Sequence, residues 1–385
     1  MIKNKKYDLI IVGGGVIGTF CAYHALRKNK SVLLLEKDAV PFEASFRNFG
    51  QAVPSGQKLD TWFEHGRRSL KIYKELQEET DISIVSHGSW YVASDEEELV
   101  LLEEMSELLK ERDYKNRLYT ASETREINPH FKQDYVRGGL FLPDEASLNP
   151  LYMVHRVRDF LINSMGLHYL NLCPVIGVEK KRGIAMLTTA NKQTFWADKV
   201  ILANGRDTQF LFPEHYPSDE LKVCKLQMMR LAPQKKILKS NILTGLTIRR
   251  YESFHACPSY QKLRVKPEHE LFQKYGIHML FKQADDGSII LGDSHQYAPV
   301  HKSAQFGFEI SAEINEIMLN EAKRITDLEN WDIDQTWAGY YLQGISSEVY
   351  TKTVDDVIHI INGIGGKGMT TSPGFTQQYI KNLYL

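Results

Sequence analysis

Short apolar runs separated by polar turns define the first part of the chain. Residues 9–12 form an apolar run of the length expected for a strand buried on both faces, and residues 32–35 form a second. A glycine-rich turn and a helical stretch lie between them, and Glu36 ends the second run. This pattern predicts a strand–turn–helix–strand unit over residues 7–37.

Apolar spacing predicts further elements. Helices are expected over residues 60–80 and 310–325, and a third is expected to begin at Asn149 and Pro150 and to end at Gly166. Capping boxes at 94–97 and 120–123 precede two more helices, so the acidic residues 95–98 are expected to form a solvated first turn rather than a metal site. Strands are predicted at 88–93, 136–143, 175–179, 184–189, 193–196 and 199–202.

The C-terminal end repeats the pattern of the N-terminal end. A buried strand over 357–361 is followed by a second glycine-rich turn at 363–370. Residues 221–292 between these ends suit irregular strands, and the strand at 288–291 is expected to end at 292–295. We predict an α/β fold with a Rossmann-like domain built from 1–85, 145–222 and 335–385. Residues 86–144 and 223–334 would form an inserted α+β domain based on a mixed β-sheet.

The opening unit carries the spacing of a dinucleotide site. Gly13 would allow a sharp turn, Gly15 a close approach of the backbone to a pyrophosphate, and Gly18 close packing of the helix on the strand. The helix N-terminus at Val16 and Ile17 would offer free N–H groups to phosphates. A carboxylate at position 36 would accept the hydroxyls of an adenosine ribose. The alternative is a glycine turn of purely structural use.

Composition narrows the class of protein. The chain has 385 residues, with 47 Lys and Arg against 48 Asp and Glu, so nothing global attracts nucleic acid or an anionic membrane. No apolar run approaches the length of a membrane span, and no integral membrane segment is expected. The four cysteines are widely spaced, which argues against a metal knot or a disulfide framework and predicts a cytoplasmic protein.

Ordered motifs resemble those of the flavin-dependent D-amino acid oxidase family, which includes glycine oxidase and sarcosine oxidase. They are LLLEK at the end of the opening unit, ASFRNFG at 44–50, GSWY at 88–91, GGLFLPD at 138–144, ADKVILANG at 197–205 and GGKGMT at 365–370. RNFGQ, RRYESF and GDSH resemble a bacterial branch of the family associated with aminophosphonate breakdown. The substrate half departs from D-amino acid oxidase, so an amino-acid substrate is not carried over.

The resemblance implies FAD as the cofactor and makes the Rossmann-like domain an FAD-binding domain. It implies that the loop at 44–51 runs along the pyrophosphate and that the turn at 365–370 meets the N1 and C2 carbonyl edge of the flavin. The expected FAD-binding residues are Gly13, Gly15, Val16, Ile17, Gly18, Glu36, Lys37, Ser45, Arg47, Asn48, Gly50, Gln51, Val175, Ala203, Asn204, Gly205, Gly365, Gly366, Lys367, Gly368, Met369 and Thr370. Some relatives attach the flavin through a cysteine or a histidine, but residues 45–51 contain neither and no cysteine follows Cys257, so non-covalent binding is expected.

The reaction that the resemblance implies is hydride removal from the carbon next to an amine, followed by hydrolysis of the imine. The flavin carries the hard step, and no side-chain acid or base is obligatory. Lys367 is the candidate catalytic residue, because a cation beside the flavin would stabilise the negative charge of the reduced ring. A solvated lysine that offers only its backbone N–H is an equal alternative.

The candidate substrate-binding residues are Arg249, Arg250, Tyr251 and His295. A guanidinium fork matches two oxygens of a carboxylate or phosphonate, whereas a surface arginine pair is the plainer alternative. If these residues form a strand, alternation would send only one arginine inward, and we favour Arg250. His295 either lines the pocket or caps a strand end.

The sequence therefore predicts an FAD-dependent oxidoreductase that acts on a small anionic amine, with an aminophosphonate or its N-methyl derivative favoured. A glycine, sarcosine or D-amino acid oxidase or dehydrogenase is the alternative, and a non-catalytic flavoprotein scaffold is another. A nicotinamide dehydrogenase would share the opening unit but would not need the C-terminal turn. The electron acceptor, oxygen or a carrier, and the oligomeric state stay open.

Overall fold

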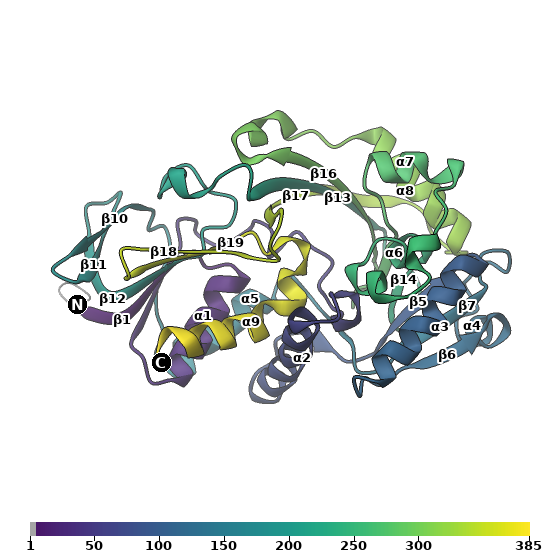
Figure 1. The fold of residues 1–385 in the computed structure, drawn as a ribbon, viewed down its shortest axis with the longest axis horizontal. Helices are drawn as coiled ribbons and strands as arrows, with labels where there is room; N and C mark the ends of the chain where they lie inside the picture. The colour runs from purple at the N-terminus through teal and green to yellow at the C-terminus, as the bar shows by residue number, and fades with distance from the viewer. Residues whose placement is uncertain (1–4) are drawn as a thin grey trace.

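A computed structural model describes residues 5–385. These residues form two eight-stranded sheets and one three-stranded sheet, which confirms the predicted mixed α/β class. Figure 1 shows an elongated molecule with the first large sheet at one end, near both termini, and the second large sheet at the other end.

The first sheet is built around β1 (Lys6–Val12), which pairs in parallel with β2 (Val32–Leu35) and β12 (Thr194–Leu202). Leu9 and Ile11 face one hydrophobic core and Ile10 faces another, so the strand is buried on both faces as predicted. The other strands of this sheet are β9 (His168–Leu170), β10 (Val175–Lys181), β11 (Ile184–Thr189), β18 (Tyr350–Val354) and β19 (Ile358–Asn362). Because β19 pairs in parallel with β12, the end of the chain joins the opening unit.

One face of the first sheet packs against helices from distant parts of the chain (Figure 1). They are α1 (Val16–Arg27), α2 (Thr61–Glu79), α5 (Met153–Met165) and α9 (Gly368–Leu383). The predicted start of the third helix is wrong by a few residues. The side chain of Asn149 accepts the N–H of Leu151 and forms a turn, and the helix begins only at Met153. Gly166 ends it in a left-handed conformation, as predicted.

The second sheet consists of β17 (Ile333–Gly344), β13 (Leu221–Leu231), β16 (Ile289–Pro299), β15 (Leu280–Gln283), β14 (Asn241–Leu243), β5 (Ser89–Ala93), β7 (Gly138–Leu142) and β6 (Arg117–Thr120), in that order. Two strand predictions are corrected. Residues 193–202 lie mostly in one strand, β12, rather than in two. β16 does not end at 292–295, because β13 continues to pair with it through Ser294 and His295.

Five helices accompany the second sheet: α3 (Glu96–Lys110), α4 (Ala121–Ile127), α6 (Gly245–Ile248), α7 (Glu270–Lys274) and α8 (Ala312–Ile325). The capping box of α4 at Thr120 and Glu123 is confirmed. The cap of α3 lies one residue later than predicted, because Asp95 rather than Ser94 accepts the N–H of Glu98. The small third sheet contains β3 (Gln51–Ala52), β8 (Ala146–Leu148) and β4 (Ile84–Val85).

The strands of the two large sheets come from alternating parts of the chain. Residues 6–35, 168–202 and 350–362 supply the first sheet, and residues 89–142, 221–299 and 333–344 supply the second. The predicted domain boundaries stay a prediction. β17 belongs to the second sheet, although the prediction assigns most of it to the FAD-binding part.

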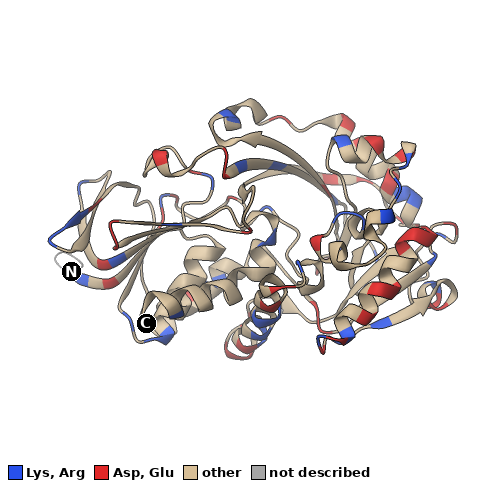
Figure 2. Ribbon diagram, viewed as in Figure 1, with Lys and Arg blue, Asp and Glu red and all other residues tan. Residues whose placement is uncertain are grey.

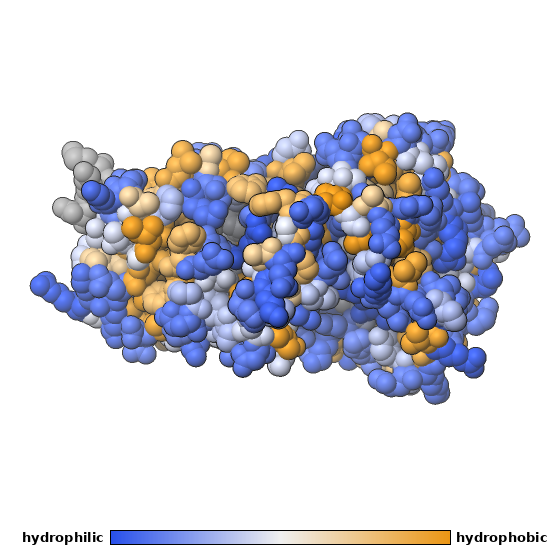
Figure 3. Space-filling view, turned by 90° about the horizontal axis from the view of Figure 1, so that it is seen from above, coloured by the Kyte–Doolittle hydropathy of each residue, from blue (hydrophilic) through white to orange (hydrophobic). Residues whose placement is uncertain are grey.

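The surface is mainly hydrophilic on the face shown in Figure 3, with separate apolar patches. No helix formed by residues 5–385 combines the length and apolar character that a bilayer span requires. The four cysteines are buried free thiols.

Candidate functional site

A cavity of about 1120 Å³ is lined by residues of both large sheets. We call residues 12–17, 36–51, 173–176, 203–211 and 362–370 the nucleotide wall, and residues 250–255, 278–280 and 293–297 the substrate wall. Every predicted FAD-binding residue except Gly18 lines the cavity, as do Arg250, Tyr251 and His295. Arg249 does not.

The first glycine turn has the geometry that its spacing predicts. Gly13 has φ +107°, and a Cβ there would overlap the carbonyl oxygen of Ala203. A Cβ at Gly18 would overlap the carbonyl oxygen of Gly13, so Gly18 acts through helix–strand packing and not by lining the cavity. A Cβ at Gly15 would meet only Ser45 Oγ, at 3.1 Å, and Gly15 lies on the wall. The backbone is therefore open to a ligand at Gly15.

Two side chains organise this turn. Glu36 is buried, and its carboxylate accepts the N–H of Gly14 at 2.8 Å and the N–H of Asp38 at 2.9 Å. A carboxylate has about four acceptor sites, so capacity remains for further donors. Ser45 Oγ accepts the N–H of Val16 at 2.9 Å and takes one of the free donors of α1.

The loop at 44–50 is shaped by its own polar side chains. Arg47 donates to the carbonyls of Phe42 at 2.9 Å and Ala338 at 3.1 Å. Asn48 donates to the carbonyl of Ala44 and accepts the N–H of Gly50. Both side chains were predicted to bond the cofactor, and the structure engages them in holding the loop that faces the cavity.

A buried lysine ties this loop to the second sheet. Lys282 on β15 donates to the carbonyls of Phe49 and Leu148, each at 2.7 Å. Next in the loop, Gln51 lines the cavity, and its buried Nε2 has no hydrogen-bond partner among residues 5–385. An amide donor without a partner on a cavity wall indicates a ligand acceptor there.

The C-terminal turn consists of η7 (Gly365–Lys367) and the start of α9. Thr370 donates to the carbonyl of Gln51 and accepts the N–H of Val53, which joins α9 to β3. Lys367 lines the cavity, and its expected role as a cation beside the flavin stays a prediction, whereas a solvated lysine does not fit the structure. Its Nζ pairs with Glu252 at 2.9 Å and with Glu348, and its side chain is only 13% exposed.

The two neighbouring arginines have different surroundings. Arg249 follows α6 and pairs with three acidic side chains at the start of α3: Asp95 at 2.6 Å, Glu97 at 3.1 Å and Glu98 at 2.6 Å. Glu98 is fully buried. The acidic run is therefore not the solvated first turn that the sequence predicts, because it pairs with Arg249. This pairing explains why Arg249 lies outside the cavity. Acidic positions recur along α3 (Figure 2).

Arg250 lies on the substrate wall. Its Nη2 donates to the hydroxyl of Tyr297 at 3.2 Å. No carboxylate among residues 5–385 lies within 4 Å of its guanidinium nitrogens, in contrast with Arg249. Its charge is therefore available to a ligand.

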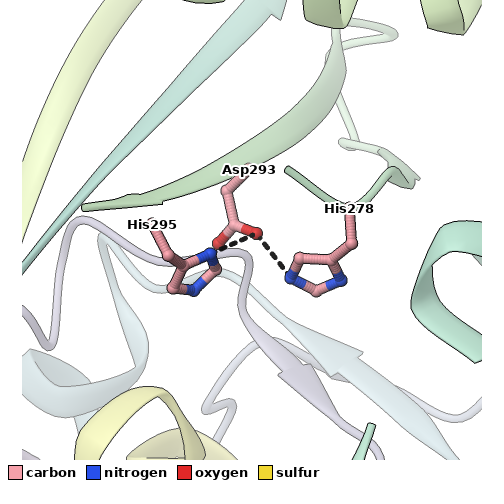
Figure 4. A group of neighbouring side chains, drawn as sticks. All are labelled: His278, Asp293 and His295. Atoms are coloured by element: carbon pink, nitrogen blue, oxygen red, sulfur yellow. Dashed lines mark ion pairs between the residues drawn. The ribbon is translucent and has the colours of Figure 1, made fainter. Parts of the chain in front are cut away.

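A cluster of His278, Asp293 and His295 completes the substrate wall (Figure 4). Asp293 Oδ1 lies 2.8 Å from His278 Nε2 and 3.8 Å from His295 Nδ1. Burial lowers the pKa of His295 to about 3. Burial acts to raise the pKa of Asp293, but His295, His278 and Arg250 outweigh it and lower that pKa to about 2. Asp293 is thus an anion between two neutral imidazoles.

Sequence reasoning missed two members of this cluster. Asp293 stands in the GDSH motif, which was interpreted as a strand end, and His278 lies in an apolar segment before β15 without any motif. Regular alternation along β16 could not have placed Asp293 and His295 on the cavity, because the register with β13 shifts at Asp293.

Residues 8–378 match the protein family described as FAD dependent oxidoreductase (DAO). The chain belongs to this family. FAD is its cofactor, and the expectation drawn from the ordered motifs is confirmed at this level.

Two glycine oxidases are similar to this DAO family member in sequence. That of Bacillus licheniformis is 23% identical over 347 residues, covering 87% of this chain and 81% of that protein. That of Bacillus subtilis (strain 168) is 26% identical over 210 residues, covering 52% of this chain and 55% of that protein, so the match spans about half of its length.

Solved structures share the fold. Glycine oxidase from Geobacillus kaustophilus superimposes with a TM-score of 0.78 at 18% identity, covering 98% of this chain and 94% of that one. L-proline dehydrogenase from P. horikoshii superimposes with a TM-score of 0.77 at 18% identity, covering 99% of this chain and 94% of that one.

The residues on the nucleotide wall fit FAD. The open backbone at Gly15, the spare acceptor capacity of Glu36 and the unpartnered amide of Gln51 lie along one cavity. The N-termini of α1 and α9 both border it, and their dipoles favour anionic or electron-rich groups.

Proposed function

We propose that this DAO family member oxidises the C–N bond of a small amine that also carries an anion, with an aminophosphonate or its N-methyl derivative as the favoured substrate. The names of its relatives support amine oxidation, since they include glycine oxidases and a 4-methylaminobutanoate oxidase. FAD supplies the acceptor for the hydride, and the imine that forms is hydrolysed to a carbonyl product.

The position of Arg250 is the observation that supports an anionic substrate. It lines the cavity, Tyr297 orients it, and no described carboxylate pairs with it. A guanidinium matches two oxygens of a phosphonate or carboxylate with parallel hydrogen bonds. Holding the anion at Arg250 would fix the carbon–hydrogen bond relative to the flavin, and such positioning lowers the barrier.

Lys367 has a positioning role in this proposal. Its pairing with Glu252 and Glu348 offsets its charge and ties the C-terminal turn to the segment that carries Arg250. The turn then offers its backbone N–H groups to the flavin edge. The ion pair holds the nucleotide wall and the substrate wall in a fixed position relative to each other.

FAD is bound without a covalent link in this proposal. Cys173 is the one cysteine on the cavity wall formed by residues 5–385, and its N–H donates to the carbonyl of Glu36 at 2.9 Å. It would therefore lie near the ribose that Glu36 is proposed to bind, rather than beside the flavin ring. Acid precipitation should leave the yellow colour in the supernatant, whereas colour in the pellet would contradict the proposal.

A small amino acid such as glycine or sarcosine is the second candidate, since a carboxylate also suits the guanidinium of Arg250. The two candidates separate in anaerobic flavin reduction by an aminophosphonate, its N-methyl derivative, its uncharged amine analogue and glycine. We expect the highest kcat/KM with the phosphonates. If none of these amines reduces the flavin, amine oxidation is wrong and a scaffold role gains support.

Arg250→Ala tests the anion grip directly. We expect kcat/KM for the anionic substrates to fall about 10²-fold, since two charge-assisted hydrogen bonds are lost, and kcat/KM for the uncharged analogue to change little. Arg250→Lys should recover little, because a point charge does not replace a fork. Arg117→Ala, at an exposed arginine of β6, is the matched control. Unchanged kinetics of Arg250→Ala on every anionic substrate would show that another residue binds the anion.

A further inference from the structure

His295 stands in the middle of β16 with its imidazole on the cavity wall. Its side chain is 9% exposed. Asp293, two residues earlier where the register of the strand shifts, directs its carboxylate toward the ring, as Figure 4 shows. The residue thus combines a buried environment, a neighbouring anion and access to the cavity.

Hydrogen bonding settles which ring nitrogen of His295 carries the proton. Nδ1 lies 3.2 Å from the carbonyl oxygen of Gly276, which only accepts, and 3.8 Å from Asp293 Oδ1. Nδ1 must therefore carry the proton, and Nε2 of the neutral ring keeps its lone pair. No hydrogen bond joins Nε2 to any of residues 5–385, and Figure 4 shows it turned away from Asp293.

His278 is not equivalent. Its Nε2 lies 2.8 Å from Asp293 Oδ1, and its Nδ1 lies 3.3 Å from Thr247 Oγ1. Both of its nitrogens thus have polar neighbours, although His278 also lines the cavity. Asp293 lies between the two imidazoles, close to His278 but 3.8 Å from His295, whose Nε2 keeps a free lone pair.

The charged and titratable groups that face His295 come from several elements. Asp293 on β16, His278 before β15 and Arg250 after α6 act on its charge, and the ring of Tyr297 on β16 stacks against it. Tyr251 after α6, Cys224 on β13 and Tyr341 on β17 interact with Asp293. Burial lowers the pKa of His295 most, Asp293 opposes that effect, and Arg250 adds to it. An anion bound at Arg250 would cancel this cation and make His295 more basic in the complex than in the free enzyme.

We propose that Nε2 of His295 takes the proton of the substrate ammonium group, so that the amine is neutral when its neighbouring carbon loses hydride. This inference rests on the proposed oxidation of an anionic amine. The nitrogen–hydrogen bond of the substrate breaks, its electron pair stays on nitrogen, and a new bond joins the proton to Nε2. No electron leaves the substrate in this step, and FAD, the cofactor of the family, would supply the acceptor for the later hydride.

Asp293 is a positioning residue in this scheme. Its carboxylate lies on the Nδ1 side of the ring and would stabilise the imidazolium that forms, as an acid beside a catalytic histidine does. Arg250 and His295 both line the substrate wall, so a substrate that carries an anion and an amine would use both residues in this proposal. The pair thus favours substrates that carry both groups over simple amines or simple anions.

The pH dependence of anaerobic flavin reduction tests the proposal. His295→Gln should slow reduction by an aminophosphonate about 10²-fold at pH 7, the contribution typical of a general base. The rate should recover toward that of the parent above about pH 10, where the amine is neutral in solution. Asp293→Asn should show the same trend with a smaller loss, and His301→Gln, an exposed histidine bonded to Ser218, is the matched control.

A loss of the same size at every pH would overturn the proposal, because a merely structural role does not depend on the charge of the substrate. Flavin content and Tm check each variant for folding, and His295→Asn serves if the glutamine variant fails. Loss of reduction on adding a chelator, with recovery on adding a divalent metal, would also overturn it. One nitrogen or oxygen atom from each of His278, Asp293 and His295 lies within 4.8 Å of the other two. Dependence on a divalent metal would show that these atoms bind a cation.

A second measurement does not depend on turnover. Nitrogen-15 spectra of histidine-labelled holoenzyme follow Nε2 directly while an amine analogue without an α-hydrogen binds. We expect the Nε2 signal to change from an unprotonated to a protonated nitrogen on binding, and to be missing in His295→Gln. An Nε2 that stays unprotonated in the saturated complex would overturn the inference.

The two proposals fail in different ways. If no amine reduces the flavin of the parent enzyme, the proposed function is wrong. If amines reduce the parent but His295→Gln matches it at every pH, only the role of His295 is wrong.

Discussion

The nucleotide wall and the substrate wall of the same cavity are built from different parts of the polypeptide. On the nucleotide wall the backbone itself borders the cavity, at the glycine turn around Gly15 and at the turn over 365–370. On the substrate wall side chains border the cavity, chiefly those of Arg250, Asp293 and His295. The first wall depends on the absence of side chains, and the second depends on their placement.

The difference shows how each wall is held in place. Side chains such as Ser45 and Glu36 stay close to the glycine turn and cap its backbone. The substrate wall needs support from farther along the chain, where the ion pairs of Arg249 fasten the segment that carries Arg250 to α3. We therefore expect substitutions to disable the nucleotide wall by blocking the space at its backbone. We expect them to disable the substrate wall by removing the ion pairs that hold its side chains in place.

Gly15→Val should have the largest effect, on the nucleotide wall. Its branched side chain would project beyond the 3.1 Å contact of the Cβ with Ser45 Oγ into the open space at the backbone, so we expect purified apoprotein. The ratio of flavin to protein absorbance measures the loss. Gly177→Val is the matched control, since a Cβ there meets only Thr188 at 4.0 Å. Full FAD occupancy of Gly15→Val would show that the nucleotide wall does not need an open backbone at this position.

Arg249→Ala tests the support of the substrate wall. The change leaves Asp95, Glu97 and the buried Glu98 without their shared cation, and breaking such a pair costs about 3 kcal/mol of the free energy of unfolding. We expect a lower midpoint in urea unfolding, with FAD still bound in the folded state. Arg117→Ala, at an exposed arginine, should leave the midpoint unchanged. Equal midpoints for both variants would show that these ion pairs do not support the wall.

His24→Gln should have a smaller effect, visible only in acid. Burial lowers the pKa of His24 to about 4 from an ordinary value of 6.5, while its Nε2 donates to the carbonyl of Pro373. The unfolded chain therefore binds this proton more readily, and stability that is present above pH 6.5 is lost as the pH falls to 4. A glutamine keeps a donor and does not titrate, so the slope of unfolding free energy against pH should fall by at most about 1.4 kcal/mol per pH unit.

Thermal unfolding from pH 4 to 7 measures this slope. His301→Gln, an exposed histidine, is the control and should follow the parent protein. A slope in His24→Gln equal to that of the parent would show that other buried groups set the acid sensitivity.

The nucleotide wall could largely be predicted from the sequence, because its chemistry is local. The roles of Gly13, Gly15 and Gly18 follow from spacing within one turn, and the motif at 365–370 specifies the second turn in the same way. Gly13 and Gly365 need a positive φ, and Gly18 needs the space that a Cβ would fill, so the residue type itself carries the information. The family assignment rests on the same motifs.

Which residues form the substrate wall depends on the tertiary structure. Arg249 and Arg250 are adjacent and chemically identical, yet they follow a helical turn rather than a strand, so their side chains diverge by about 100°. Only the position of α3 determines that one is neutralised and the other lines the cavity. Likewise Gly276, His278, Asp293 and His295 meet only because the pairing of β13 extends β16 beyond its apolar run. Convergence of side chains from separate elements depends on packing and long-range register, which no local pattern encodes.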